Sequence, residues 1–145
     1  MVKLVAAAAV AWPLLLGSVV WHRAAFGDTV WTTIAHVAAS RICHQKPERS
    51  FSTAGVQWPV CGRCSGLYLG AAAGVLPALL LRHRLRRRRA VIATLVVAAV
   101  PTAATLVVEW LALAPVSSLA RFATALPLGA AVLAALVGAV VERRR

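Results

Sequence analysis

The sequence predicts an all-α membrane protein, in which four transmembrane helices form a bundle and a short amphipathic helix lies at the membrane interface. Two observations predict this class. Hydrophobic residues make up 61% of the chain, whereas Asp and Glu together number only four. Four apolar runs are also each about 20 residues long, the length that a helix needs to cross a hydrocarbon core of about 30 Å. The 145 residues suit one domain, so we expect a single integral membrane domain over residues 1–145.

The first apolar run covers residues 2–20, and Lys3 and Ser18 are its polar members. Pro13 lies in the middle of the run, where a proline is expected to kink the helix. A cleaved signal peptide is the alternative interpretation. However, the run is longer than the apolar core of an ordinary signal peptide, and no clear cleavage site follows it. We therefore expect a retained first transmembrane helix.

A polar segment, residues 22–59, separates the first two apolar runs. It should begin with a short turn in which Asp28 caps the following helix, because an Asp side chain accepts hydrogen bonds from the exposed amides of a helix start. Residues 30–43 place apolar side chains at helical spacing but are too few and too polar to cross a membrane. We expect them to form an amphipathic helix on the membrane surface.

The chain then changes from an expected loop to an expected helix. Residues 45–59 should form the loop, because Pro47 and Pro59 disfavour a helix and Gly55 permits a turn. The second transmembrane helix should cover residues 60–81. Glycines at every fourth position give it a flat stripe on which a neighbouring helix can pack closely. Packing within the chain is the simpler interpretation, and a homo-oligomer is the alternative. The stripe consists of Gly62, Gly66, Gly70 and Gly74.

The third and fourth transmembrane helices are expected over residues 90–110 and 122–141, and basic segments determine their orientation. Arg82–Arg89 contains six arginines, and Arg143–Arg145 ends the chain. Short loops rich in Lys and Arg stay on the cytoplasmic side of a membrane. Two helices separate these segments, so both lie on one side. We therefore expect a multi-pass protein of the cell (inner) membrane, with both termini in the cytoplasm and the segment 22–59 outside.

The formal net charge of +12 has the same explanation. In a soluble protein such a charge would suggest nucleic acid as a partner. Here the basic residues lie between apolar runs, and no polar domain exists that could hold nucleic acid. The expected partners are the lipid bilayer and its anionic headgroups, which the arginines of Arg82–Arg89 and Arg143–Arg145 would contact.

Three cysteines lie in or beside the polar segment, and they are the main candidates for chemistry. Cys61 and Cys64 are three residues apart at the expected start of a helix, so their sulfurs should lie on nearly the same face. The helix dipole there favours the thiolate, the form that binds metals and attacks disulfides. An odd number of cysteines cannot all pair within one chain.

Three interpretations of these cysteines remain open. The first is a metal site for zinc or iron, in which Cys43, His44, Cys61 and Cys64 are the ligands, or in which the three cysteines bind with water or another group. The second is a redox dithiol, because the run Cys-Gly-Arg-Cys looks like the active-site motif of thioredoxin-type oxidoreductases, although no thioredoxin-like pattern surrounds it. The third is a structural disulfide, which an oxidising outer face would favour.

Further polar residues are expected near the same level of the membrane. Glu109 ends the third helix in an apolar setting, where an acid usually needs a partner. It should pair with Arg121, and its alternative role is proton acceptor or metal ligand. Arg49 and Arg63 are expected to bind an anionic group or to extend to lipid headgroups. Tyr68 lies one turn below the second cysteine of the Cys-x-x-Cys pair and should pack over the site or donate a hydrogen bond into it.

The cysteine-rich half of the chain resembles an uncharacterised multi-pass membrane family of prokaryotes, domain of unknown function 2085. The resemblance extends over about residues 35–140. It implies an integral membrane protein with a polar cluster of Cys, His and Arg, and it implies no particular reaction. In the second half, Glu109, Arg121 and Gly129 fill the acid, arginine and glycine places of the family pattern, and Ser118 stands where the pattern has Asn. The residues that carry the resemblance are Cys43-His44-Gln45, Pro47-Glu48-Arg49-Ser50-Phe51, Gly55 and Pro59-Val60-Cys61-x-Arg63-Cys64-x-Gly66-x-Tyr68-x-Gly70.

Overall fold

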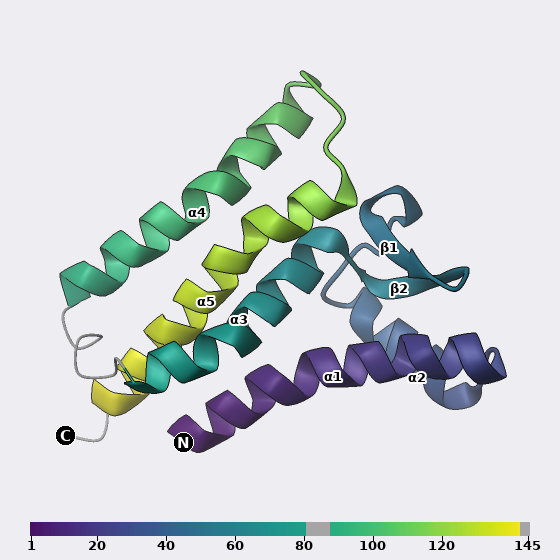
Figure 1. Ribbon diagram of the computed structural model, residues 1–145, viewed down its shortest axis with the longest axis horizontal. Coiled ribbons are helices and arrows are strands. Elements are labelled where there is room, and N and C mark those ends of the chain that lie inside the picture. Colours follow the sequence, from purple (N-terminus) through teal and green to yellow (C-terminus); the bar gives the residue numbers. More distant parts are fainter. Residues whose placement is uncertain (81–87, 143–145) are drawn as a thin grey trace.

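The computed structural model describes residues 1–80 and 88–142 and confirms the expected bundle of four long helices with one short helix (Figure 1). The four long helices are apolar and long enough to cross a membrane. A small two-stranded sheet is an addition to the expected architecture. The elements in chain order are α1 (Val2–Phe26), α2 (Val30–Ser40), the 3-10 turn η1 (Pro47–Arg49), β1 (Ser50–Thr53), β2 (Val56–Cys61), α3 (Gly62–Leu80), α4 (Arg88–Trp110) and α5 (Ser118–Glu142).

The long helices lie in the order α4, α5, α3, α1 across the bundle (Figure 1). The start of α1 and the end of α5 lie at one end of the bundle, and the β1–β2 hairpin lies at the other, which we call the hairpin end. The starts of α3 and α5 meet at the hairpin end, where Gly62 approaches Ser118. The start of α1 and the end of α5 therefore share one side, as four crossings require. Most of Arg82–Arg89 and all of Arg143–Arg145, where lipid headgroups were expected, lie outside the described residues.

The glycine stripe of α3 packs against α5. A Cβ added at Gly70 would collide with the Leu126 carbonyl oxygen, and one added at Gly74 would come within 2.9 Å of the Ala130 Cα. Gly129 of α5 makes the reverse approach, toward the backbone of α3. The two helices run in parallel at a distance that only glycine permits, because its missing side chain lets the backbones touch. The stripe is thereby covered from within the chain and is not open to a second copy.

The first polar turn differs from the expected one. Helix α1 does not end near residue 20 but continues to Phe26. Gly27 then takes a φ of 77°, a left-handed conformation in which glycine is favoured. Thr29, not Asp28, caps α2, because its side chain accepts from the Thr32 backbone while the Thr32 side chain accepts from the Thr29 backbone. Helix α2 has the expected start, and it ends at Ser40 instead of residue 43.

The expected loop over residues 45–59 is wrong, because most of it forms η1 and the hairpin. The hairpin closes through Ala54 and Gly55, whose φ angles of 51° and 77° suit a tight two-residue turn. Strand pairing is regular near the turn and becomes irregular further along, in the part of β2 that contains Pro59. Proline has no N–H for the ladder, which accounts for the irregularity. Because β2 continues through Cys61, α3 begins at Gly62 instead of residue 60.

Candidate metal centre

The three cysteines come together at the hairpin end from three different local structures. Cys43 follows α2, Cys61 is the last residue of β2, and Cys64 lies in the first turn of α3. Their sulfur atoms all lie within 4.8 Å of one another. The three thiols are free of disulfides, and Cys43 is buried while the other two are partly buried. The hairpin and the helix start thus assemble a compact group of three soft ligands.

Hydrogen bonds join the three cysteines directly. The backbone N–H of Cys61 donates to the Cys43 sulfur over 3.1 Å. The pKa of the Cys61 thiol lies below its ordinary value, first of all because the Cys64 side chain hydrogen-bonds to its sulfur. Burial acts in the opposite direction, and bonds from nearby backbone amides and from the Cys43 side chain add to the lowering. This lowered pKa favours the Cys61 thiolate, the form that both metal binding and disulfide attack require.

Apolar side chains form the wall of the site. Cys43 packs in one buried cluster with Leu16 of α1, Ala39 of α2 and Val60 of β2. Tyr68 packs against this cluster, and its ring meets the Trp12 ring edge to face with centroids 6.0 Å apart. A water-poor wall on one side strengthens any charge interaction inside the site. Tyr68 is thus part of the apolar surroundings of Cys43.

Gln45 fixes the loop that carries Cys43, a role that was not predicted from the sequence. Its side-chain amide donates to the carbonyl of His36 over 2.8 Å and to that of Pro59 over 2.7 Å. The backbone carbonyl of Gln45 accepts a hydrogen bond from the Gln57 side chain over 2.7 Å. Gln45 also has a φ of 50°, which bends the chain after Cys43. A polar residue directly after Cys-His, in a segment that must turn back to a strand, is the signal that could have identified it.

His44 lies outside the group of sulfurs. Its side chain is exposed, whereas that of the preceding Cys43 is buried, so the two neighbours face different surroundings. The chain takes a left-handed conformation at the next residue, Gln45. Arg49 ends η1 and is partly exposed. The structure therefore brings together three of the four expected ligands.

A buried charge cluster joins three helices, α3, α4 and α5. Glu109 of α4 accepts from Arg121 of α5 and from Arg63 of α3, the latter over 3.3 Å. The three side chains are only 9–17% exposed. Arg63 also donates to the Thr105 hydroxyl. The expected Glu109–Arg121 pair is present, and Arg63 is bound inside the protein instead of reaching toward headgroups. Two arginines and one glutamate leave this cluster with one positive charge.

Comparison with known proteins agrees with the resemblance. The family model described as "Predicted membrane protein (DUF2085)" matches residues 43–135, which include the cysteines, Glu109 and Arg121. An uncharacterized protein of Methanothermobacter thermautotrophicus is 39% identical over 88 residues, which are 61% of this chain and 78% of that protein. An uncharacterized protein of Methanocaldococcus jannaschii is 49% identical over 37 residues, 26% of this chain and 24% of that protein. No solved structure matches.

Proposed function

The chain belongs to the DUF2085 family of predicted membrane proteins, and from this premise we propose that it holds a zinc or iron ion in the three-cysteine site at its hairpin end. The observation that carries the proposal is the approach of all three sulfurs to within 4.8 Å of one another. Sulfurs bound to one tetrahedral zinc ion lie about 3.8 Å apart, since each bond is about 2.3 Å long. Small side-chain rotations would close the site around an ion.

Charge supports the same proposal. Three thiolates around a divalent ion carry one net negative charge. The Arg63–Glu109–Arg121 cluster, toward the same end of the bundle, carries one net positive charge. Opposite charges in a medium of low dielectric constant stabilise one another. In the proposed site Cys43, Cys61 and Cys64 are the thiolate ligands. A water molecule, or His44 after rotation of its exposed side chain, completes the shell.

The test is a measurement of bound metal and free thiols on the whole chain, purified in mild detergent without reductant. We expect about one ion per chain, since the described residues contain one such group of ligands. The variants Cys43→Ser, Cys61→Ser and Cys64→Ser should each lose the ion, because each removes one thiolate. Ser52→Ala is the matched control, as it changes an exposed hydroxyl of the hairpin. Metal-free protein with a Cys61–Cys64 disulfide would contradict the proposal.

A second candidate is thiol–disulfide exchange, and the hydrogen bonding of Cys61 favours it. In this mechanism the Cys61 thiolate attacks a substrate disulfide, forms a mixed disulfide and releases one substrate thiol. Cys64 then loses its proton and attacks the Cys61 sulfur. The second substrate thiol leaves, and a Cys61–Cys64 disulfide remains. Cys43 would serve as an exchange partner. In a related reaction, a quinone would oxidise the same pair of thiols. The quinone would be reduced to the quinol, and the Cys61–Cys64 disulfide would remain.

The two candidates differ in what Cys43→Ser does. The metal site needs Cys43 as a ligand, so this variant should lose the ion. The exchange reaction needs only Cys61 and Cys64 for its two steps, so the same variant should still cycle between dithiol and disulfide when it is treated with dithiothreitol and then with an oxidised thiol. A disulfide that resists mild reduction in the parent chain would favour a purely structural role for the cysteines.

Orientation is part of the proposal. The number of expected crossings puts the basic segments Arg82–Arg89 and Arg143–Arg145 on the same side as the N-terminus. Short segments rich in Lys and Arg stay in the cytoplasm. The hairpin end with its cysteines would then face outward from the cell membrane. Disulfide formation would compete with metal binding on that oxidising side. The burial of Cys43 would protect its sulfur from this reaction.

A further inference from the structure

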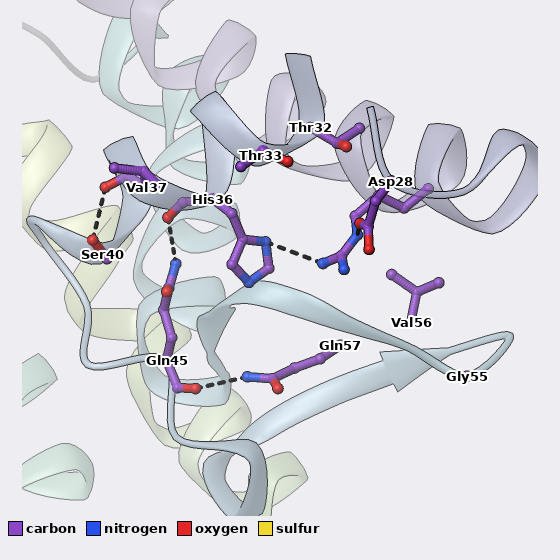
Figure 2. A pocket seen from close by; sticks show the side chains of 11 residues that line it. Asp28, Thr32, Thr33, His36, Val37, Ser40, Gln45, Gly55, Val56 and Gln57 are labelled. Atoms are coloured by element: carbon purple, nitrogen blue, oxygen red, sulfur yellow. Dashed lines mark hydrogen bonds and ion pairs between the residues drawn. The ribbon is translucent and has the colours of Figure 1, made fainter. Parts of the chain in front are cut away.

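A second candidate site includes Gln45 and residues of the hairpin in its lining. It is an open pocket of about 820 Å³ between the end of α1, helix α2 and the hairpin. Figure 2 shows Asp28, His36 and Gln57 around it, contributed by the α1–α2 turn, by α2 and by β2. Arg23, in the last turns of α1, also lines it. None of these residues takes part in the proposed metal site.

The charges in the pocket balance. The Arg23 Nε lies 2.5 Å from a carboxylate oxygen of Asp28, and the Arg23 side chain is 26% exposed whereas that of Asp28 is 68% exposed. His36 adds no charge near neutral pH, because burial first and the charge of Arg23 second hold the pKa of its ring below the ordinary value, against the smaller opposing effect of Asp28. The pocket thus presents one cation and one anion side by side. Such a pair favours neither an anion nor a cation as ligand.

Hydrogen bonding determines which atoms are left for a ligand. Arg23 donates to the Nδ1 of His36 over 3.4 Å, and because a guanidinium has no acceptor, the His36 proton must be on Nε2. The Nε2–H group is a donor on the side of the ring that faces the hairpin (Figure 2). Gln57 uses its NH₂ group to donate to Gln45. Within the described part of the chain its side-chain oxygen receives no hydrogen bond, so it remains an acceptor.

We propose that this pocket binds a zwitterionic group, whose anionic end lies on Arg23 and His36 and whose ammonium end lies on Asp28 and Gln57. Arg23 and His36 supply donors, and Asp28 and Gln57 supply acceptors, so a ligand with both charges satisfies both kinds of group at once. The free edge of Arg23 binds the anionic oxygens. The outer oxygen of the exposed Asp28 carboxylate accepts an ammonium N–H.

Two sources share this chemistry: a free amino acid and the headgroup of an ethanolamine phospholipid. Exposed aromatic side chains lie on the two helices that line the pocket, at the end of α1 and in the first turn of α2, namely Trp21, Phe26 and Trp31. Aromatic rings gather where a bilayer meets water. The pocket would therefore lie at the depth of lipid headgroups, where either source reaches it.

The experiment is thermal unfolding of the whole chain in a nonionic detergent, with glycerophosphoethanolamine, glycerophosphocholine or glycine as the added probe. Glycerophosphoethanolamine should raise the unfolding midpoint. Glycerophosphocholine should bind more weakly by about tenfold or more, because its methylated ammonium has no N–H to donate to Asp28. Glycine with an affinity near that of glycerophosphoethanolamine would identify free amino acids as the source. Binding of glycerophosphoethanolamine alone would identify the lipid headgroup.

Two variants test the residues. Asp28→Asn keeps the shape of the side chain and removes its charge, and Arg23→Gln removes the cation. Each should weaken binding of the zwitterion by about tenfold or more, since each removes a charge-assisted hydrogen bond. Arg41→Gln, an exposed cation just after α2, is the matched control and should bind as the parent does. Equal binding of the two headgroups, or undiminished binding to Asp28→Asn, would overturn the proposal, whatever the metal content of the protein.

Discussion

At the scale of single residues, the cysteine site combines a predictable part with an unpredictable one. The sequence pattern predicts that Cys43 joins Cys61 and Cys64, and the three sulfurs do lie together. The same pattern predicts His44 beside them, but this side chain is exposed. Neighbouring residues in a chain differ in direction by an amount that depends on backbone angles. The sequence pattern contains no measure of those angles. The ligand roles themselves remain predictions.

The lowered pKa of Cys61 leads to a prediction about reactivity. In metal-free protein at pH 7, iodoacetamide should modify Cys61 faster than an ordinary thiol, because more of it is thiolate. The rate should fall as the pH is lowered through its reduced pKa, where the sulfur becomes protonated. Mass spectrometry of the peptides identifies the modified residue. Preferential modification of Cys43 or Cys64 instead would contradict the lowered pKa of Cys61.

Glu109 leads to a prediction about stability. Glu109→Gln should leave Arg63 and Arg121 buried without a counter-charge, and breaking a buried pair in this way costs about 3–5 kcal/mol. The midpoint of thermal unfolding in detergent should fall markedly. Glu48→Gln is the control, because Glu48 is an exposed acid of η1. Equal midpoints for the two variants would show that the cluster contributes little to stability.

At the scale of elements, the long helices were predictable and the hairpin was missed. Four apolar runs of sufficient length determine four helices, because a spanning segment must satisfy its own backbone hydrogen bonds. The missed hairpin has short strands, and Pro59 within β2 argues against a strand. A turn at Ala54-Gly55 between segments rich in Phe, Thr, Val and Trp was the available signal. The end of α1 was misplaced for a related reason, since polar residues can continue a helix beyond the membrane.

The contact between α3 and α5 leads to a prediction at this scale. Gly70→Ala should destabilise the protein by about 1–3 kcal/mol or more, because its Cβ would overlap the Leu126 carbonyl and the helices must move apart. Gly17→Ala in α1 is the matched control, since nothing lies within 4 Å of the place its Cβ would take. That variant should be neutral or slightly more stable, because alanine favours a helix. Thermal unfolding of both in one detergent gives the comparison, and similar midpoints would refute the close contact.

At the scale of the whole molecule, the four crossings and their shared ends follow from the sequence, whereas the side of the membrane depends on the distribution of charge. Ser52→Cys on the hairpin and Ala90→Cys near the start of α4 place exposed thiols at opposite ends of the bundle. A membrane-impermeant maleimide should label Ser52→Cys in intact cells, above the level of the parent chain. It should label Ala90→Cys only after lysis. The opposite result would reverse the proposed orientation.

The parallel contact of α3 and α5 also has a consequence for how the protein is made. The ribosome delivers α3 and then α4 before α5 exists, so the glycine face of α3 enters the bilayer without its partner. Glu109 likewise arrives when Arg63 is present and Arg121 is still to be synthesised. All three cysteines and the apolar wall around Cys43 are complete before that moment. The contact of α3 with α5 and the charge cluster are thus late events in biogenesis, and a chain that stops before α5 would leave Glu109 without Arg121.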